Sequence, residues 1–153
     1  ANSGAQSTQW RSCFRKNLLI RKVALVTGGG SGIGRVIATE LASLGATVVI
    51  VSRDKNKCEM AAKEMNESLQ QQNSKCRGIV VVGPSTSIRN EEQIEEMVSY
   101  IIETYKSLDM LVNNAGGQFV SAAEDLSGRG FGAVVDTNLT GTFLVCKEVY
   151  NQY

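Results

Sequence analysis

The chain has 153 residues, of which 42% are apolar and 20% charged, enough for one globular domain with a hydrophobic core. Sixteen basic residues nearly balance fifteen acidic ones, and the net charge of +1 gives no field of one sign that would attract nucleic acid. No apolar run approaches the roughly 20 residues that a membrane span requires, so no nucleic-acid partner and no membrane span are expected.

The first 22 residues are interpreted as an amino-terminal tail that precedes the domain. No acidic residue occurs before Glu40, whereas basic residues and serines are frequent in this stretch. That composition is typical of an organelle transit segment, and a solvated tail is the alternative interpretation. We expect the domain itself to occupy residues 23–153.

The first half of this domain alternates short apolar runs with helical patterns. Residues 23–27 form an apolar run that ends in glycines, as expected of a strand buried on both faces. A helix follows, in which Ile33, Ile37, Leu41 and Leu44 recur at helical spacing and Gly45 provides the stop. Residues 47–51 form the second strand. The segment from Asp54 to Gln72 predicts a helix with Asp54 as its cap.

The second half continues the alternation. Residues 79–82 form a third strand, and Pro84 then interrupts regular structure. A helix is predicted over residues 91–105 and a fourth strand over 109–112, followed by a glycine-rich loop and a helical stretch over roughly 131–153 with an interruption near Gly141. Strands that alternate with helices indicate right-handed parallel crossovers, so the fold class is α/β, a doubly wound parallel sheet (Rossmann fold) with strand order 3-2-1-4.

Residues 27–34 connect the first strand to the first helix and contain five glycines. Their spacing is Gly-x-x-x-Gly-x-Gly, in the strand–turn–helix context of a dinucleotide fingerprint. Glycines allow the turn to pass close to a pyrophosphate, and the first turn of the helix offers N–H groups and the positive end of its dipole. The sequence therefore predicts a phosphate-binding loop.

Ser52 and Arg53 follow the second strand, where an acidic residue would bind the adenosine ribose of NAD. An arginine at this place fits the 2′-phosphate of NADP, so NADP(H) is the expected cofactor. The alternative is an exposed arginine at a strand end. Asp54 is adjacent and is assigned to the helix cap.

Histidine is absent from the sequence, which excludes Ser-His-Asp and Cys-His mechanisms within these residues. The cysteines lie far apart without a Cys-x-x-Cys pair, so no metal site is expected. They are interpreted as free thiols in a reducing compartment. The four are Cys13, Cys58, Cys76 and Cys146.

Two further motifs complete a family pattern over about residues 23–150. Asn113-Asn114-Ala115-Gly116 follows the fourth strand, and residues 138–143 read Asn-Leu-Thr-Gly-Thr-Phe in the last helix. Together with the glycine-rich loop, they make the chain resemble the short-chain dehydrogenase/reductase family. Residues 88–92, 113–119, 121–124 and 137–143 are most similar to the subgroup of peroxisomal trans-2-enoyl-CoA reductases, although 2,4-dienoyl-CoA and 3-oxoacyl reductases share much of this half.

The resemblance implies roles for individual residues. Gly28, Ser31, Gly32, Ile33 and Gly34 would hold the pyrophosphate, and Arg53 would bind the 2′-phosphate. Asn114, Ala115 and Gly116 would line the nicotinamide ribose side, whereas Asn113 fits a structural role as well. Ser87 stands where relatives have an acidic residue or asparagine beside the adenine. Asn138 matches the active-site asparagine, which supports a proton relay through a water molecule.

The Tyr-x-x-x-Lys of the family, whose lysine lowers the pKa of the tyrosine, does not occur in this sequence. Tyr100 and Tyr105 are followed four residues later by Thr104 and Asp109, and Ser121 and Ser127 are too early for the family's serine. The chain is therefore expected to be an amino-terminal fragment, inactive by itself and incomplete at the carboxyl-terminal side of its fold.

By the same resemblance, the full-length protein is expected to be an NADPH-dependent reductase of an acyl-CoA-type substrate, a homo-oligomer, and peroxisomal, with a mitochondrial or cytoplasmic location as the alternative. A ketoreductase with another carbonyl substrate stays open. So does a non-catalytic NADP-binding module whose mature form ends here.

Overall fold

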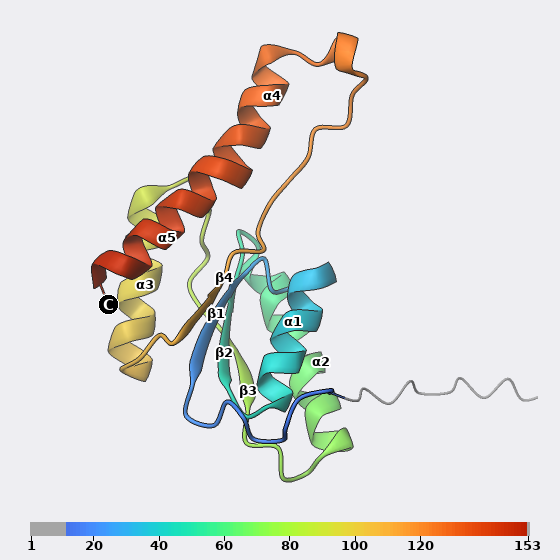
Figure 1. Cartoon of the computed structure of the whole chain (residues 1–153), viewed down its shortest axis with the longest axis vertical. Coiled ribbons are helices and arrows are strands. Elements are labelled where there is room, and N and C mark those ends of the chain that lie inside the picture. The colour runs from blue at the N-terminus through green and yellow to red at the C-terminus, as the bar shows by residue number, and fades with distance from the viewer. Residues whose placement is uncertain (1–11, 153) are drawn as a thin grey trace, which may run out of the picture.

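The computed structural model describes residues 12–152 and contains one sheet of four parallel strands (Figure 1). The strands are β1 (Val23–Thr27), β2 (Thr47–Val51), β3 (Ile79–Val82) and β4 (Met110–Val112). Their order is β3-β2-β1-β4, which confirms the predicted order. In register, Leu25 of β1 lies between Val49 of β2 and Leu111 of β4. The predicted bounds hold for the first three strands, and β4 begins one residue later than predicted.

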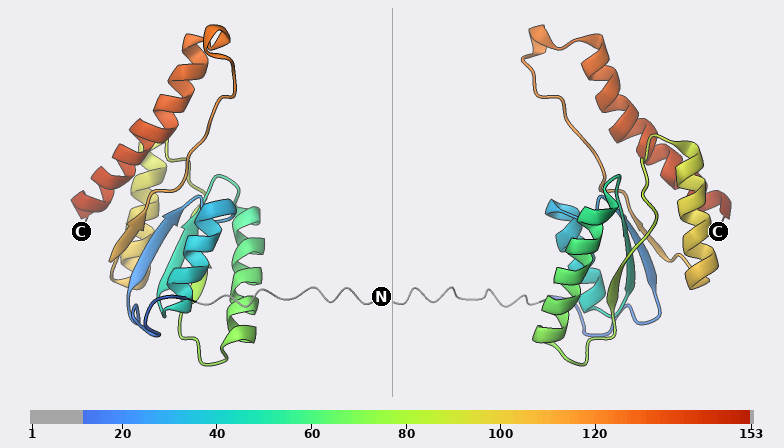
Figure 2. Two further views of the ribbon diagram at one scale, coloured as in Figure 1. Left: turned by 45° about the vertical axis from the view of Figure 1, so that its right-hand side comes forward. Right: turned by 180° about the vertical axis from the view of Figure 1, so that it is seen from behind.

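Helices cover both faces of the sheet, as Figure 2 shows. α1 (Gly32–Ser43) and α2 (Lys55–Gln72) lie on one face, and α3 (Glu91–Tyr105) and α5 (Gly141–Gln152) lie on the other. Alternate strand residues separate into two cores because successive side chains of a strand point to opposite faces. Val26, Val48 and Ile50 pack under α1 and α2, whereas Leu25, Val49 and Val51 pack under α3 and α5.

The predicted start and cap of α2 are confirmed, since the Asp54 side chain accepts a hydrogen bond from the Lys57 N–H at 3.0 Å. α3 has the predicted bounds, and its buried residues are Ile94, Met97, Val98 and Ile101.

The last helical stretch is one helix with a π-helical turn inside it. α4 (Gly128–Val135) begins three residues before the prediction, because Ser127 caps it by accepting from the Gly130 N–H. The predicted interruption near Gly141 is the turn Asp136–Thr140, where the Gly141 N–H bonds to the Asp136 carbonyl, five residues earlier. α5 then continues to Gln152.

The predicted apolar face of α1 is partly wrong. The helix contacts the sheet through small residues, Gly34, Ala38 and Ala42, whereas Ile33 is 75% exposed. Leu44 is buried as expected. The reason is the close approach of the helix to the loop after β4: a Cβ atom on Gly34 would lie 2.4 Å from Asn114 Nδ2. Gly45 ends the helix with a φ of +103°, as predicted.

Part of the predicted tail lies against the domain. The Leu19 N–H donates to the Leu44 carbonyl at 3.0 Å, and the Leu19 side chain packs against the core under α1 and α2. Ile20 covers Gly45, where an added Cβ would be 2.9 Å from its Cγ1. Residues 12–22 are thus not a fully solvated segment. The rest of the predicted tail, residues 1–11, lies outside the described residues.

Candidate cofactor-binding site

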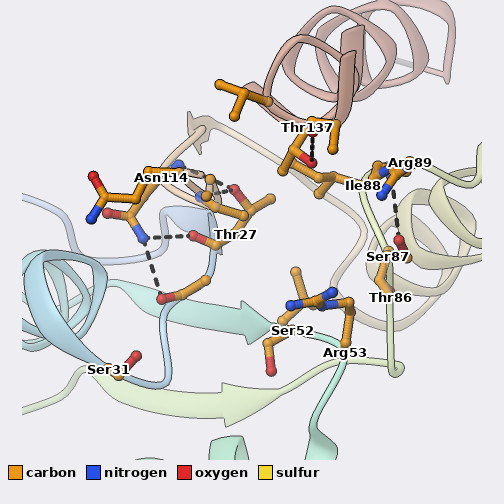
Figure 3. A pocket seen from close by; sticks show the side chains of 18 of the residues that line it. Thr27, Ser31, Ser52, Arg53, Thr86, Ser87, Ile88, Arg89, Asn114 and Thr137 are labelled. Carbon is orange, nitrogen blue, oxygen red and sulfur yellow. Dashed lines mark hydrogen bonds between the residues drawn. The ribbon is translucent and has the colours of Figure 1, made fainter. Parts of the chain in front are cut away.

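A cavity of about 430 Å³ opens beyond the carboxyl ends of the strands, shown in close-up in Figure 3. In a doubly wound sheet this is the edge at which ligands bind. Its walls come from the loops after β1, β2, β3 and β4 and from the α4 helix. Two arginines, Arg53 and Arg89, are its charged lining residues, and its lining contains no carboxylate. The cavity therefore favours an anionic ligand.

The glycines of the phosphate loop bring backbone close to this cavity. Gly28 has a φ of +68°, and a Cβ there would lie 2.9 Å from Asn114 Nδ2, so a larger residue would be strained and crowded. Gly32 has a φ of +54°, but a Cβ there would meet no atom within 4 Å. The loop is thus tightly packed against Asn114 at Gly28 and open at Gly32. This arrangement leaves space beside the backbone for a phosphate.

The amino terminus of α1 lacks the side-chain cap that α2, α3 and α4 have. Asp54, Asn90 and Ser127 each accept a backbone N–H in the first turn of α2, α3 and α4. Ser31 is the N-cap of α1 and makes no such bond. The amides of this first turn, with the positive end of the helix dipole, are therefore available to an anion. Ser31 itself lines the cavity.

Asn114 joins the loop after β4 to the phosphate loop. Its Nδ2 donates to the Thr27 carbonyl at 3.0 Å and to the Gly28 carbonyl at 3.2 Å. In return, the Thr27 hydroxyl oxygen accepts the N–H groups of Asn114 and Ala115 at 3.1 and 3.0 Å. These bonds hold the two loops together. Asn113 instead donates to Cys146 Sγ on α5.

Asn138 lies in the π-helical turn and holds the same loop from the other side. Its Oδ1 accepts the Gly117 N–H at 2.9 Å, and its Nδ2 donates to the Gly117 carbonyl at 2.8 Å. Gly116 approaches so closely that an added Cβ would be 2.8 Å from Asn138 Oδ1. Both ends of the amide are thus used to fix the loop after β4. The expected proton relay at Asn138 stays a prediction.

Arg53 lies in the turn between β2 and α2 and lines the cavity (Figure 3). Its side chain is exposed, and the salt bridges found among residues 12–152 do not include it. Arg89 differs, because its guanidinium lies 3.6 Å from the Asp136 carboxylate of the π-helical turn. Of the two cavity arginines, Arg53 is thus the one whose charge no carboxylate of the described chain neutralises.

Ser87 begins the turn that leads into α3. Its N–H donates to Gln93 Oε1 at 2.8 Å, and its hydroxyl oxygen accepts a long bond from the Arg89 N–H at 3.4 Å. The residue lines the cavity, and its contact with an adenine stays a prediction.

The structure brings most of the predicted site residues to one cavity. Those that line it are Gly28, Ser31, Arg53, Ser87, Asn114, Ala115 and Gly116. Gly32, Ile33 and Gly34 form the adjoining first turn of α1, and Asn138 contacts the lining residue Gly117. Their binding roles stay predictions.

Several lining residues were not predicted. Thr86, Ile88, Arg89 and Thr137 are examples. Thr27 and Ser52 also line the cavity; the first begins the predicted phosphate-binding loop and the second follows a predicted strand, but neither was given a role. Arg89 and Thr137 had no chemical signal, because only the packing of the π-helical turn beside the loop after β3 brings them to the cavity.

The sheet order, the phosphate loop and the two asparagine contacts define the class of protein. The model of the short chain dehydrogenase family matches residues 22–153, and the chain belongs to that family. A peroxisomal 2,4-dienoyl-CoA reductase of Arabidopsis thaliana is 36% identical over 135 residues, which cover 88% of this chain and 42% of that protein. The chain thus spans less than half the length of this curated relative.

Solved structures show the same fold. The citronellol catabolism dehydrogenase of Pseudomonas aeruginosa PAO1 superposes with a TM-score of 0.81 at 42% identity, over 94% of this chain and 55% of that chain. An actinorhodin polyketide ketoreductase with NADPH superposes with a TM-score of 0.73 at 36% identity, over 84% of this chain and 46% of that one. Within residues 12–152, none of the helices is long and apolar enough to cross a membrane.

Proposed function

We propose that this chain binds NADPH as the nucleotide-binding part of a reductase that acts on trans-2-enoyl-CoA. Two features of one cavity without carboxylates carry this proposal. The amino terminus of α1 has no side-chain cap, and Arg53 forms no salt bridge with any of residues 12–152. An NADP cofactor has a pyrophosphate and a 2′-phosphate, and so needs positive groups at two separate places. When bound, NADPH supplies the hydride.

The residues of this chain would bind and orient the cofactor. The first-turn amides of α1 and Ser31 would receive the pyrophosphate, and Arg53 would pair with the 2′-phosphate. Ser87 would lie beside the adenine. Ala115 and Gly116 would contact the nicotinamide ribose, on a loop that Asn114 and Asn138 hold in place.

The substrate class and the location rest on the relatives. The name of the Arabidopsis relative gives it both a peroxisomal location and an unsaturated acyl-CoA substrate, which supports the same location and substrate class for the protein proposed here. It also favours a second candidate, reduction of 2,4-dienoyl-CoA. The structural relative named a ketoreductase supports a 3-oxoacyl substrate as a further alternative.

Substitution of Arg53 tests the cofactor. We expect Arg53→Ala to weaken NADPH binding about 10- to 100-fold, the loss of about 1.5–3 kcal/mol that hydrogen bonds to a charged group contribute, and to leave NADH binding unchanged. Arg129→Ala removes an exposed arginine outside the cavity and serves as the matched control. Calorimetric titration of the wild type and both variants with each cofactor measures the six dissociation constants. Wild-type affinity for NADH equal to that for NADPH would contradict the proposal.

Turnover assays test the reaction. The full-length protein should oxidise NADPH fastest with trans-2-enoyl-CoA among enoyl-, dienoyl- and 3-oxoacyl-CoA substrates. The 153-residue chain alone should show no turnover, because its sequence lacks the Tyr-x-x-x-Lys that would exchange the proton. Cofactor binding by the full-length protein without turnover on any of the three substrates would favour a non-catalytic module.

A further inference from the structure

The segment after β3, residues 83–86, makes contacts that the cofactor-binding motifs do not explain. The Gly83 N–H extends the parallel ladder by donating to the Ile50 carbonyl at 3.0 Å. Pro84, which has no N–H, then turns the chain toward β2, and a Cβ on Gly83 would lie 2.7 Å from Val51 Cγ1. The chain after β3 therefore packs against the carboxyl end of β2, next to the turn that contains Arg53.

Two hydrogen bonds then join this segment to the arginine turn. The Ser85 hydroxyl donates to the Arg53 carbonyl at 2.9 Å, and the Thr86 N–H donates to the Ser52 carbonyl at 3.0 Å. Thr86 is only 3% exposed, and its own hydroxyl donates to the Pro84 carbonyl. Ser85, by contrast, is exposed and does not line the cavity.

The turn is fixed from its other side as well. The Ser52 hydroxyl accepts the Asp54 N–H at 3.1 Å and lies 3.2 Å from Cys58 Sγ, which is buried against Gly30 of the phosphate loop. The backbone of Arg53 is thus held between Ser52 and Ser85, and its guanidinium extends from that fixed backbone to the cavity (Figure 3). Because this backbone is already ordered in the free chain, less conformational entropy is lost when the arginine binds a ligand.

We propose that Ser85 is a positioning residue for discrimination between phosphorylated and unphosphorylated adenosine: its hydroxyl holds the Arg53 backbone so that the guanidinium meets a 2′-phosphate. This inference rests on the proposed function, since it assumes that Arg53 binds that phosphate. Ser85 acts through Arg53 and does not touch the cofactor.

The probes are 2′,5′-ADP and 5′-AMP, which differ only in the 2′-phosphate and leave the nicotinamide half out of the measurement. Calorimetric titration of the chain should show that Ser85→Ala weakens 2′,5′-ADP binding about three- to tenfold, the size expected for one lost hydrogen bond, with 5′-AMP binding unchanged. Ser85→Thr keeps a hydroxyl and should restore most of the affinity. Ser121→Ala, which removes an exposed serine hydroxyl outside the cavity, is the matched control and should change neither constant.

A double-mutant cycle separates positioning from a general structural effect. If Ser85 acts through Arg53, then Ser85→Ala should cost nothing further in an Arg53→Ala background. An equal loss for both nucleotides, an undiminished loss in the Arg53→Ala background, or no loss at all would overturn the inference. Equal affinity of the wild type for the two nucleotides would overturn the proposed cofactor first, so the two failures are distinguishable.

Discussion

Asp109 fixes the end of the sheet opposite the cavity through three contacts of one carboxylate. Its Oδ1 lies 2.7 Å from Lys22 Nζ, and its Oδ2 accepts the Val23 N–H and the Ser107 hydroxyl, each at 2.8 Å. The hydrogen bond from Lys22, followed by that from the Val23 backbone, lowers the pKa of Asp109 from 3.8 to about 2. These bonds join the start of β1 to the residue before β4.

This lowered pKa predicts an acid-sensitive contribution to stability. A carboxyl group with a lowered pKa in the folded state stabilises fully above its unfolded pKa, and its contribution is lost as the pH falls from about 4 to about 2. We expect Asp109→Asn to lower the free energy of unfolding by about 1 kcal/mol at pH 7, since Lys22 is open to solvent, and by less at pH 3. Urea midpoints at both pH values measure this.

Glu59→Gln, at an exposed position of α2, is the control and should leave the pH dependence unchanged. An Asp109→Asn variant that loses as much stability at pH 3 as at pH 7 would show that the charge of Asp109 contributes nothing.

At the scale of the element, α1 is determined by its small residues. Gly34 approaches the Gly28 carbonyl so closely that a Cβ would lie 2.6 Å from that oxygen. Backbone cannot move aside as a flexible side chain can. The glycine is therefore required by the contact between the helix and the phosphate loop, although glycine disfavours helices.

Two alanine substitutions measure this requirement against helix propensity. Gly34→Ala should destabilise the chain by about 1–3 kcal/mol through overpacking. Gly132→Ala in α4, where an added Cβ meets no atom within 4 Å, should stabilise it by about 0.5–1 kcal/mol. Thermal or urea unfolding of the two variants gives the comparison. Changes of the same sign would mean that the close approach at Gly34 has no energetic consequence.

The open side of β3 is covered by a side chain of α2. Asn66 Nδ2 donates to the Val80 carbonyl at 2.8 Å, and its Oδ1 accepts the Val80 N–H at 2.9 Å. β3 is an edge strand of the sheet, and unpaired backbone groups at such an edge can pair with other chains. Asn66 thus pairs with the edge strand in place of a further strand.

Removing this amide should both destabilise and expose the edge. Asn66→Ala is expected to lower the free energy of unfolding by about 2 kcal/mol, because two partly buried backbone groups lose their partners, and to increase light scattering of concentrated samples. Asn56→Ala, an exposed asparagine of the same helix, is the matched control and should be slightly stabilising. Equal stability of the two variants would refute the protective role of Asn66.

The sequence predicted the elements better than their contacts. The strands and the helices α2 and α3 were predicted from apolar periodicity and local capping residues. Their predicted bounds were therefore close to the observed ones. The face of α1 was misplaced because the approach of Asn114 to Gly34 joins residues far apart in the chain. The same reason explains why the pairing of Asn138 with Gly117 and the position of Arg89 were not predicted.

On the scale of the whole molecule, the α4–α5 helix leaves apolar side chains in solvent. In Figure 2 its α4 end extends beyond the sheet. Phe131, Leu139, Phe143 and Tyr150 along this helix are all more than half exposed. Exposed apolar area of this kind promotes association. We therefore expect the chain alone to associate in solution.

Charge substitution on this helix tests the association. The 153-residue chain should increase in mass with concentration in analytical ultracentrifugation, and Leu139→Lys combined with Phe143→Lys should suppress the increase. Met60→Lys, an exposed apolar position of α2, should not. A wild-type chain that stays monomeric at every concentration would contradict the prediction.

The missing cap of α1 has a thermodynamic consequence. Three other helices satisfy a first-turn amide with a side chain of their own, whereas α1 leaves that stabilisation to a ligand. If that ligand is the proposed cofactor, folding and binding are linked: a cofactor at 100 times its dissociation constant adds about 2.7 kcal/mol to the free energy of unfolding. The amount of folded chain in a cell would then follow its supply of NADP.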